Sequence, residues 1–391
     1  MKRILAFLLA LSLALTACTA TSENNPCTDS LGCVTIGSSE PVTIAVALTL
    51  SGPNAPYGID ALRGVELAIA DHEDIFNHPI ELIQEDDLCT AEGGQAAAER
   101  LAQNPNVVGV IGGATCSDAT EKAAVVLSEA GMVLISPSST AASLTSTSEH
   151  EPGFLRTIYN DQSQAKMVAD FAFNALGART MATLHDNTAY SDGLQQEACQ
   201  LFEQRGGTCV EQLHIATGGP YNTAVQQIAK LSPDVLYIPL YAEDAMNISS
   251  EIIKIGLLRT AVIGSDGLLS SDFAARAKSA EGMYISGPST LDLDPDFKEK
   301  YRARYGEEPI AVYAAQAYDA AMMLFSAIEA SVKTTGSDML IPRKALREAL
   351  FTTKDYQGLS GVLTCSPLGD CAPPNIVIYQ LDTRRFRVIY P

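Results

Sequence analysis

Short apolar runs alternate with amphipathic helical segments along most of this chain, and this alternation constrains the fold more than any other feature. One series begins with VTIAVAL (42–48), and a second begins after FLRTIYND (154–161). Runs that are apolar on both faces and are linked by helices indicate parallel strands covered on both sides. The sequence therefore predicts an α/β protein with two doubly wound parallel-sheet modules in tandem.

The expected elements follow from this alternation. The strands are 42–48, 80–86, 107–112, 132–136, 180–186, 208–215, 234–240 and 260–266. The helices between them are 58–72, 93–103, 118–130, 161–176, 190–205, 221–230 and 243–255. Further helices are expected at 295–305, 310–331 and 342–351, and 361–390 is typical of antiparallel strands around turn residues. A late block of helices and then strands indicates a chain that crosses repeatedly between two lobes.

The first residues have the anatomy of an export signal. Two basic residues precede an apolar run (4–15) that is too short for a membrane span of ~20 residues. The sequence LTAC (15–18) resembles a bacterial lipobox, so we expect residues 1–17 to be a lipoprotein signal peptide and Cys18 to carry lipid. The alternative is an ordinary secretory signal with an incidental cysteine.

The charge of the chain restricts its partners. The formal net charge is −20, and no basic run offsets it, so nucleic acid and anionic lipid are disfavoured as partners. Residues 18–40 are small and polar, as expected of a flexible tether. No later stretch is apolar enough to span a bilayer. We therefore expect an exported protein that faces the periplasm or the cell exterior and contacts the membrane only through its lipid.

The cysteine content indicates disulfide bonds. Nine cysteines include Cys18, and an even remainder in an exported chain is typical of a disulfide framework. Many connectivities are possible, of which sequence proximity favours Cys27–Cys33, Cys199–Cys209 and Cys365–Cys371. That choice leaves Cys89 and Cys116 to each other. No CxxC spacing or histidine cluster indicates a metal site, and we expect no cofactor.

Polar residues collect where the expected strands end, and ligands of open α/β sheets bind outside the carboxyl ends of the strands. These residues are Tyr57, Ser117, Ser138, Ser139 and Thr140 in the first module, and Tyr190, Tyr241 and Asp266 in the second. Hydroxyls and unpaired N–H groups at two helix starts favour an anion such as a carboxylate. An acid beside two aromatic rings would suit an ammonium group. Together they describe a receptor for a free amino acid.

Each of these residues also has an ordinary structural explanation. A serine at a helix start is usually a cap, and a strand-end aspartate is usually a turn former. Tyrosines at strand ends commonly close a core. Asp118 argues against the anion site, because a carboxylate at that helix start would compete with an anionic ligand.

Seven segments, in order and at similar spacing, resemble the type 1 periplasmic binding proteins of the leucine/isoleucine/valine-binding group, which feed ABC importers. The segments are SGPNAPYG, DDLCTAEGGQAAAERL, GGATCS, ISPSSTAASLT, HDNTAYSDGL, LYIPLYAED and IGSDGL. The resemblance covers about residues 42–390 and implies two lobes joined by a three-crossover hinge. The crossovers are expected near residues 158, 287 and 356. The expected lobes are 41–158 plus 288–355 (N-lobe) and 159–287 plus 356–391 (C-lobe).

The resemblance also implies roles for the strand-end residues. A Cys89–Cys116 disulfide would lie just before a ligand-binding serine, Ser117. The ligand carboxylate would be held by Ser117 and by the Ser138, Ser139 and Thr140 segment. Tyr57, Tyr190 and Tyr241 would line the cleft, and Asp266 would bind the amine. Glutamate is common in this group where Asp266 stands, and a small apolar residue where Ser138 stands, so these departures bear on which amino acid is bound.

The implied function is capture of a free amino acid, branched-chain or similar, between two lobes that close around it. The closed protein, a monomer, would then dock on an ABC permease. A sensor subunit with the same fold is the alternative. A serine acyl hydrolase is a weaker alternative. SQAK (163–166) fits the SxxK pattern, but its companion motifs and GxSxG are absent from the sequence. His185 beside Asp186 could be a base, but no nucleophile is tied to it.

Overall fold

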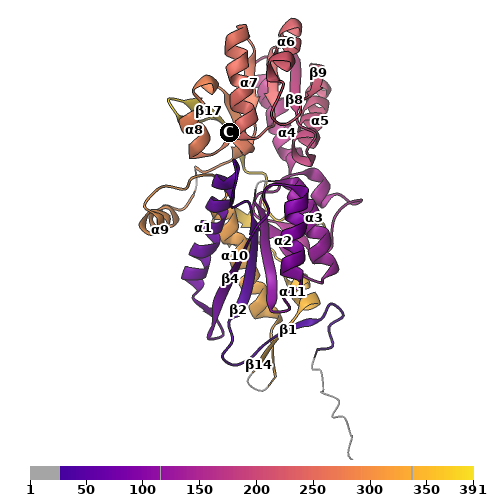
Figure 1. Cartoon of the computed structure of the whole chain (residues 1–391), viewed down its shortest axis with the longest axis vertical. Helices are drawn as coiled ribbons and strands as arrows, with labels where there is room; N and C mark the ends of the chain where they lie inside the picture. Colours follow the sequence, from indigo (N-terminus) through magenta and orange to yellow (C-terminus); the bar gives the residue numbers. More distant parts are fainter. Residues whose placement is uncertain (1–26, 115, 292, 336–337) are drawn as a thin grey trace, which may run out of the picture.

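The computed structural model describes residues 27–391 except 115, 292 and 336–337. The predicted signal peptide (1–17) and the predicted lipidation site, Cys18, lie outside the described residues. The molecule consists of two lobes stacked along its long axis, each built on one sheet with helices on both faces (Figure 1). The predicted α/β class with two doubly wound lobes is confirmed.

The N-lobe is built on a six-stranded sheet ordered β3-β4-β2-β5-β6-β7, in which only β3 and β4 pair antiparallel. Its strands are β2 (Val42–Leu48), β3 (Asp74–Ile75), β4 (His78–Asp86), β5 (Val107–Ala114), β6 (Leu134–Ser136) and β7 (Phe154–Arg156). Its helices are α1 (Ala55–His72), α2 (Ala91–Ala102), α3 (Ser117–Glu129), the 3-10 turn η1 (Ala142–Thr145), α9 (Pro295–Tyr305), α10 (Ala314–Ser331) and α11 (Arg343–Phe351). Every residue of β2 is buried, which explains why all residues of that strand except Thr43 are apolar.

The C-lobe is built on a seven-stranded sheet ordered β18-β17-β12-β11-β10-β8-β9. Its strands are β8 (Thr180–His185), β9 (Thr208–His214), β10 (Val235–Ile238), β11 (Ala261–Gly264), β12 (Tyr284–Pro288), β17 (Ile376–Asp382) and β18 (Arg385–Tyr390). The strands from β9 to β12 are parallel, and β17 and β18 add to them antiparallel, as expected of the chain's last segment. Its helices are α4 (Asp161–Asp170), η2 (Phe171–Ala175), α5 (Ala189–Gln204), α6 (Tyr221–Leu231), α7 (Ala242–Ile255), η3 (Asp266–Leu268), α8 (Ser271–Arg276) and η4 (Lys278–Ala280).

Two small sheets complete the N-lobe, and both correct the expected boundaries. The first is β1 (Cys33–Ile36), β14 (Asp338–Pro342) and β13 (Lys333–Thr335). The flexible tether predicted for 18–40 is therefore wrong for Cys33–Ile36, because Val34 and Ile36 are buried in the N-lobe core beside Met339 and Ile341.

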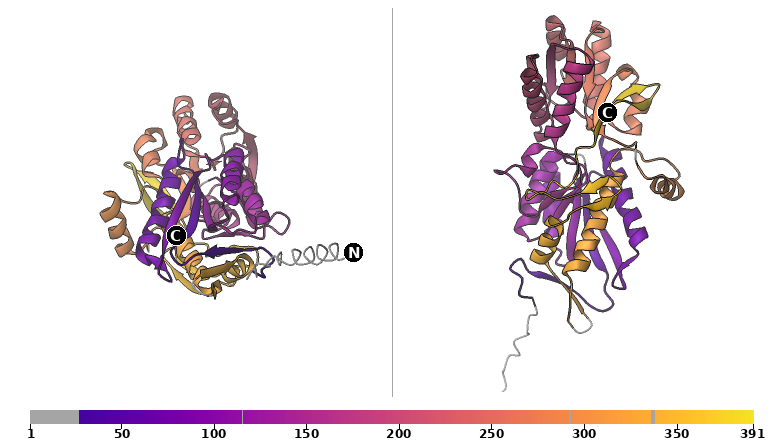
Figure 2. Two further views of the ribbon diagram at one scale, coloured as in Figure 1. Left: turned by 60° about the horizontal axis from the view of Figure 1, so that its bottom comes forward. Right: turned by 180° about the vertical axis from the view of Figure 1, so that it is seen from behind.

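The second small sheet is the hairpin β15 (Tyr356–Gly358) and β16 (Gly361–Leu363). Leu363 and Cys371 are buried in the N-lobe core, and the backbone N–H of Cys371 donates to the Arg156 carbonyl at 3.1 Å. The third crossover, expected near 356, therefore lies after Cys371 and before β17. Both views agree that α10 and α11 (orange) lie in the lower lobe, whereas β17 lies in the upper one (Figures 1 and 2).

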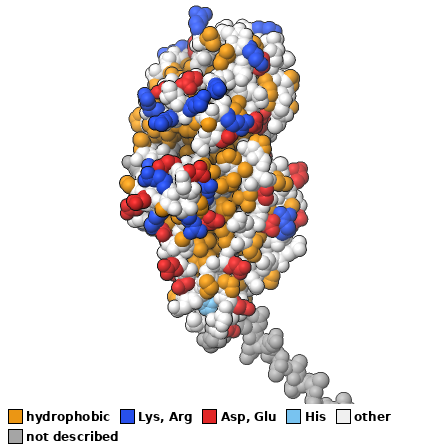
Figure 3. Space-filling view, turned by 60° about the vertical axis from the view of Figure 1, so that its left-hand side comes forward, with side chains coloured by type: hydrophobic (Ala, Val, Ile, Leu, Met, Phe, Trp, Pro, Cys, Tyr) orange, Lys and Arg blue, Asp and Glu red, His pale blue; other side chains and the backbone are white. Residues whose placement is uncertain are grey.

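The negative net charge of the chain does not make every face of the molecule acidic. On the side where α1 and α9 lie, acidic and basic side chains are interspersed with apolar ones (Figure 3). Within the described residues, every helix is too short or too polar to cross a membrane.

Candidate functional site

The carboxyl ends of the two parallel sheets face each other, and the predicted site residues lie at that junction. All of them are buried except Tyr241, which is partly buried. Hydrogen bonds cross between the lobes here: the Tyr57 hydroxyl donates to the Gly267 carbonyl at 2.6 Å, and the Tyr313 hydroxyl donates to Asp266 at 3.0 Å. The structure therefore represents the closed arrangement of the lobes.

Asp266 lies at the centre of the junction, directly after β11. One carboxylate oxygen accepts hydrogen bonds from the Tyr190 hydroxyl at 2.6 Å and from the Gln164 amide at 3.1 Å, and the other accepts from Tyr313. Burial raises the pKa of Asp266, and these three donors oppose the rise. The ring of Tyr190 stacks on that of Tyr241 with centroids 5.4 Å apart. A buried acid flanked by aromatic rings can receive an ammonium group.

Gln164 and Tyr313 were missed in the sequence, although both contact Asp266. Gln164 lies one turn inside α4, and Tyr313 is the residue that precedes α10. Both fall within segments that the sequence identifies as helical, so no strand-end signal marks them. The polar residues at the starts of helices 161–176 and 310–331 were the available clue.

The hydroxyl groups on the N-lobe side of the junction form hydrogen bonds with backbone groups of the same lobe. Ser138 and Ser139 donate their hydroxyl hydrogens to the Gly113 carbonyl at 2.8 and 2.6 Å, and the Ser117 hydroxyl accepts from the Ala141 N–H at 3.3 Å. A hydroxyl has one hydrogen to donate. Ser138 and Ser139 therefore fix the loop after β6 to the end of β5, whereas the Ser117 hydroxyl serves this loop as an acceptor.

Arg156 supports the same loop from beneath, a role that the sequence did not reveal. Its guanidinium is fully buried and donates to the Ser139 carbonyl at 3.1 Å and to the Ala141 carbonyl at 2.9 Å. Its Nε lies 2.5 Å from Asp370, which pairs it with the segment before the third crossover. The loop after β6 is thereby tied to the segment that precedes the third crossover.

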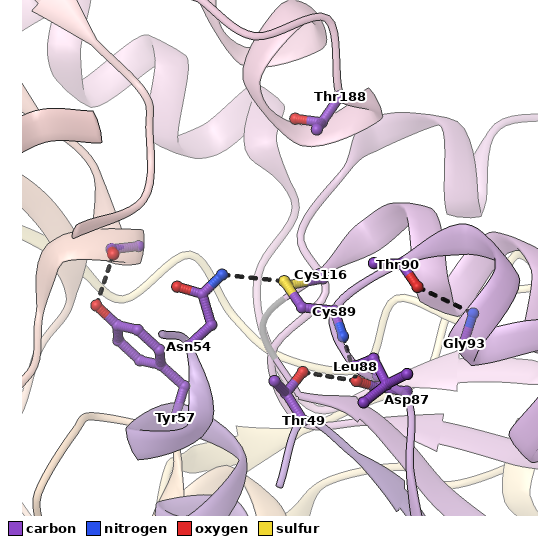
Figure 4. Close-up of a disulfide and its surroundings, with 12 residues drawn as sticks. Thr49, Asn54, Tyr57, Asp87, Leu88, Cys89, Thr90, Gly93, Cys116 and Thr188 are labelled. Atoms are coloured by element: carbon purple, nitrogen blue, oxygen red, sulfur yellow. Dashed lines mark hydrogen bonds between the residues drawn. A yellow bond between two sulfur atoms is a disulfide. The ribbon is translucent and has the colours of Figure 1, made fainter. Parts of the chain in front are cut away.

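The predicted Cys89–Cys116 disulfide is present and connects the loops after β4 and β5 (Figure 4). Leu88 and Cys89 adopt left-handed backbone conformations, with φ values of 56° and 59°. Asp87 holds this turn, because one of its oxygens accepts from the Thr49 hydroxyl at 2.6 Å and from the Cys89 N–H at 2.9 Å. The disulfide thus fixes the start of α3, where Ser117 lies. The expected pairs Cys27–Cys33, Cys199–Cys209 and Cys365–Cys371 are present as well.

The objection raised by Asp118 is resolved by where its side chain points. A carboxylate oxygen of Asp118 accepts a hydrogen bond from the Ala189 N–H at 3.1 Å. Ala189 is the first residue of α5 in the C-lobe, where N–H groups are unpaired and the helix dipole favours an anion. Asp118 therefore bridges the closed lobes, and its carboxylate is engaged at the start of α5 rather than at the start of α3.

The groups considered for catalysis are engaged elsewhere. Lys166 of the SxxK match is exposed and pairs with Asp170 at 2.8 Å, one helical turn ahead. His185 lies 3.3 Å from Asp192. In the described part of the chain, no group of three or more His, Cys, Asp or Glu side chains is arranged to hold a metal ion.

Comparison with known proteins identifies relatives of this fold and site. Residues 41–371 match the family model described as "Periplasmic binding protein". The Leu/Ile/Val-binding protein homolog 3 of Brucella melitensis is 25% identical, with 87% of this chain and 91% of the relative covered. The Leu/Ile/Val-binding protein of Escherichia coli K12 is 28% identical, with 68% of this chain and 73% of the relative covered. A leucine-binding protein from Thermotoga maritima has a similar structure, with a TM-score of 0.81 at 23% identity, covering 89% of this chain and 97% of that one.

Proposed function

Because this chain belongs to the periplasmic binding protein family, and to its branched-chain amino acid ABC transporter type, we propose that it captures a free amino acid between its lobes and delivers it to an ABC importer. The observation that carries this proposal is Asp266, a buried acid at the junction of the lobes whose carboxylate accepts a hydrogen bond from Tyr313 of the N-lobe. The protein would act as an exported monomer, anchored through Cys18 and facing the periplasm or the cell exterior.

In this proposal the two lobes recognise opposite ends of a zwitterion. The ligand carboxylate is bound at the start of α3 by Ser117, and by Thr140 in the loop that Ser138, Ser139 and Arg156 hold in place. The amine is bound by Asp266, and Tyr57, Tyr190 and Tyr241 form the walls. A ligand that contacts both lobes binds the closed arrangement more tightly than the open one, and this difference drives closure.

Isothermal calorimetry against free amino acids, small amides and aromatic acids tests the proposal. We expect wild-type protein to bind at least one free amino acid, and Asp266→Ala to weaken that binding by about a hundredfold or more, because the ammonium loses its charged partner. Asp296→Ala is a matched control, since Asp296 is an exposed acid in the first turn of α9. Unchanged affinity in Asp266→Ala, or a preferred ligand without a cationic nitrogen, would contradict the proposal.

A further inference from the structure

A second buried carboxylate, Asp161, lies close to Asp266. Asp161 is the first residue of α4, only 2% of its surface is exposed, and its backbone N–H donates to the Thr140 carbonyl at 2.9 Å. This contact places Asp161 against the ligand loop of the N-lobe. After burial, the charge of Asp266 is the largest influence that raises the pKa of Asp161. The two acids therefore share one region of the interlobe junction.

Asp161 differs from Asp266 in its partners. The Thr140 hydroxyl lies close enough to lower the pKa of Asp161, but neither carboxylate oxygen has a hydrogen bond of good geometry among the described residues. Buried polar groups in folded proteins nearly always have a partner, supplied by the protein, by water or by a ligand. A buried carboxylate with so little hydrogen bonding therefore indicates that a donor from outside the chain completes this region.

Neighbouring side chains are incomplete in the same way. The Gln164 carbonyl oxygen and the Tyr159 hydroxyl are buried and also lack partners among the described residues. Gln164 stands one turn after Asp161, and its amide group is already used on Asp266 at 3.1 Å and on the Ser286 hydroxyl at 2.9 Å. What remains open is a carboxylate, an amide oxygen and a phenol. Such a set suits a group rich in N–H donors, and aromatic rings favour a cation.

The balance of charges at the junction also favours a cationic group in the ligand. The basic side chain that acts on Asp161 is Arg156, and it is already committed to Asp370 and to two backbone carbonyls. A zwitterionic amino acid adds no net charge, so its ammonium offsets one of the two acids and leaves the other without a counter-charge. Buried charges are stable when they are paired.

We propose that Asp161 binds a second cationic nitrogen of the ligand, so that the amino acid captured by this cleft is a diamino carboxylic acid. This inference rests on the proposed function, because it assigns the α-amine to Asp266 and the side-chain amine to Asp161. It names the ligand class from the groups that remain open in the closed junction.

Ornithine and norleucine separate these possibilities, because their side chains have nearly the same shape and differ in the terminal ammonium group. We expect calorimetry to show that wild-type protein binds ornithine at least about tenfold more tightly than norleucine. Asp161→Asn should remove that preference by weakening ornithine binding about tenfold or more, while norleucine binding changes by less than about threefold. Asp296→Asn, at an exposed first-turn acid, should leave both affinities unchanged.

Thermal unfolding shows whether Asp161→Asn is folded, and Asp161→Ala provides a second variant in which the same loss of preference is expected. Wild-type protein that binds norleucine as tightly as ornithine, or binds neither, would overturn the inference. So would an Asp161 variant that weakens both ligands equally, as expected if the acid only holds water. Loss of both ligands in Asp266→Ala, with no preference for ornithine in wild-type protein, would refute this inference and leave the proposed function intact.

Discussion

Two buried aspartates show how differently the lobes use the same side chain. Asp60 in α1 of the N-lobe accepts four hydrogen bonds, from the Tyr301 hydroxyl and from the backbone N–H groups of Ile310, Tyr313 and Ala314, at 2.9–3.1 Å. Asp161 in the C-lobe has no such donor among the described residues. Burial raises the pKa of both acids. The hydrogen bonds of Asp60 therefore stabilise the protein itself, whereas Asp161, which the Thr140 hydroxyl approaches without a bond of good geometry, is the acid that we propose a ligand completes.

The same contrast extends over both faces of the junction. On the N-lobe face, Ser138 and Ser139 are tied to Gly113. On the C-lobe face, the carbonyl oxygen of Gln164 has no hydrogen-bond partner in the described part of the chain. A face whose polar groups are satisfied can position a common feature of all ligands, such as a carboxylate. Selection among ligands then falls to the face that is incomplete.

The largest effect is expected when the satisfied acid is removed. Asp60→Ala leaves four donors, three of them on buried residues, without an acceptor, so we expect the free energy of unfolding to fall by about 3–5 kcal/mol, as measured in urea. Asp161→Asn should lower it by less than about 1 kcal/mol, because no hydrogen bond is lost. Equal losses in the two variants would remove the distinction between the lobes. Asp60→Ala should also weaken ligand binding, since Asp60 positions Tyr313 against Asp266.

A smaller effect on the free energy of unfolding is expected from pH. Even a buried acid that accepts hydrogen bonds loses hydration when it ionises, and this raises its pKa. Asp319 in α10 accepts from the Leu359 and Ser360 N–H groups at 2.8 Å, yet burial raises its pKa to about 6. The folded state then binds a proton more tightly than the unfolded state, so this group stabilises the protein below about pH 4. That contribution is lost as pH rises through about 6.

Asn at this position does not titrate, so the variant removes this dependence. Between pH 4 and pH 7, the free energy of unfolding of Asp319→Asn should rise relative to wild type by up to about 3 kcal/mol. Urea unfolding at several pH values measures this change, which is independent of any constant cost of the substitution. A difference that stays the same at every pH would show that Asp319 titrates normally.

The smallest effect is expected at the contact that joins the two lobes. Asp118→Ala removes one hydrogen bond to the start of α5, and that bond exists in the closed arrangement. We expect ligand affinity to fall about two- to tenfold, with little change in the free energy of unfolding of either lobe. Calorimetry measures the first and urea unfolding the second. A variant with unchanged affinity would show that the bridge follows closure without favouring it.

The sequence predicts the elements best where one local pattern is complete. Val42–Leu48 is apolar except for Thr43, and Pro295–Tyr305 begins with a proline and is followed by Gly306, so both were placed to the residue. Cys33–Ile36 was missed because its partner strand, Asp338–Pro342, lies some three hundred residues away along the chain. The third crossover was misplaced because the sequence does not distinguish two antiparallel hairpins. The β15–β16 hairpin belongs to the N-lobe, whereas β17 and β18 belong to the C-lobe sheet.

The site could be predicted where its residues follow strands. Tyr57, Tyr190 and Asp266 were identified from their position, and the structure brings them together. Arg156 and Tyr313 were missed because their roles depend on which loop lies against them after folding. The bonds from Ser138 and Ser139 to Gly113 were equally hidden, since they depend on the spacing of two neighbouring strand ends.

The small sheet formed by β1, β14 and β13 has a mechanical consequence. Tension applied to the chain at Cys27 passes through the Cys27–Cys33 bond into β1, and from there into the core shared with β14. Under the proposed anchoring through Cys18, the N-lobe would bear this tension directly. The C-lobe, which is reached through the crossovers, would be free of it, so closure on a ligand would not work against the pull of the anchor.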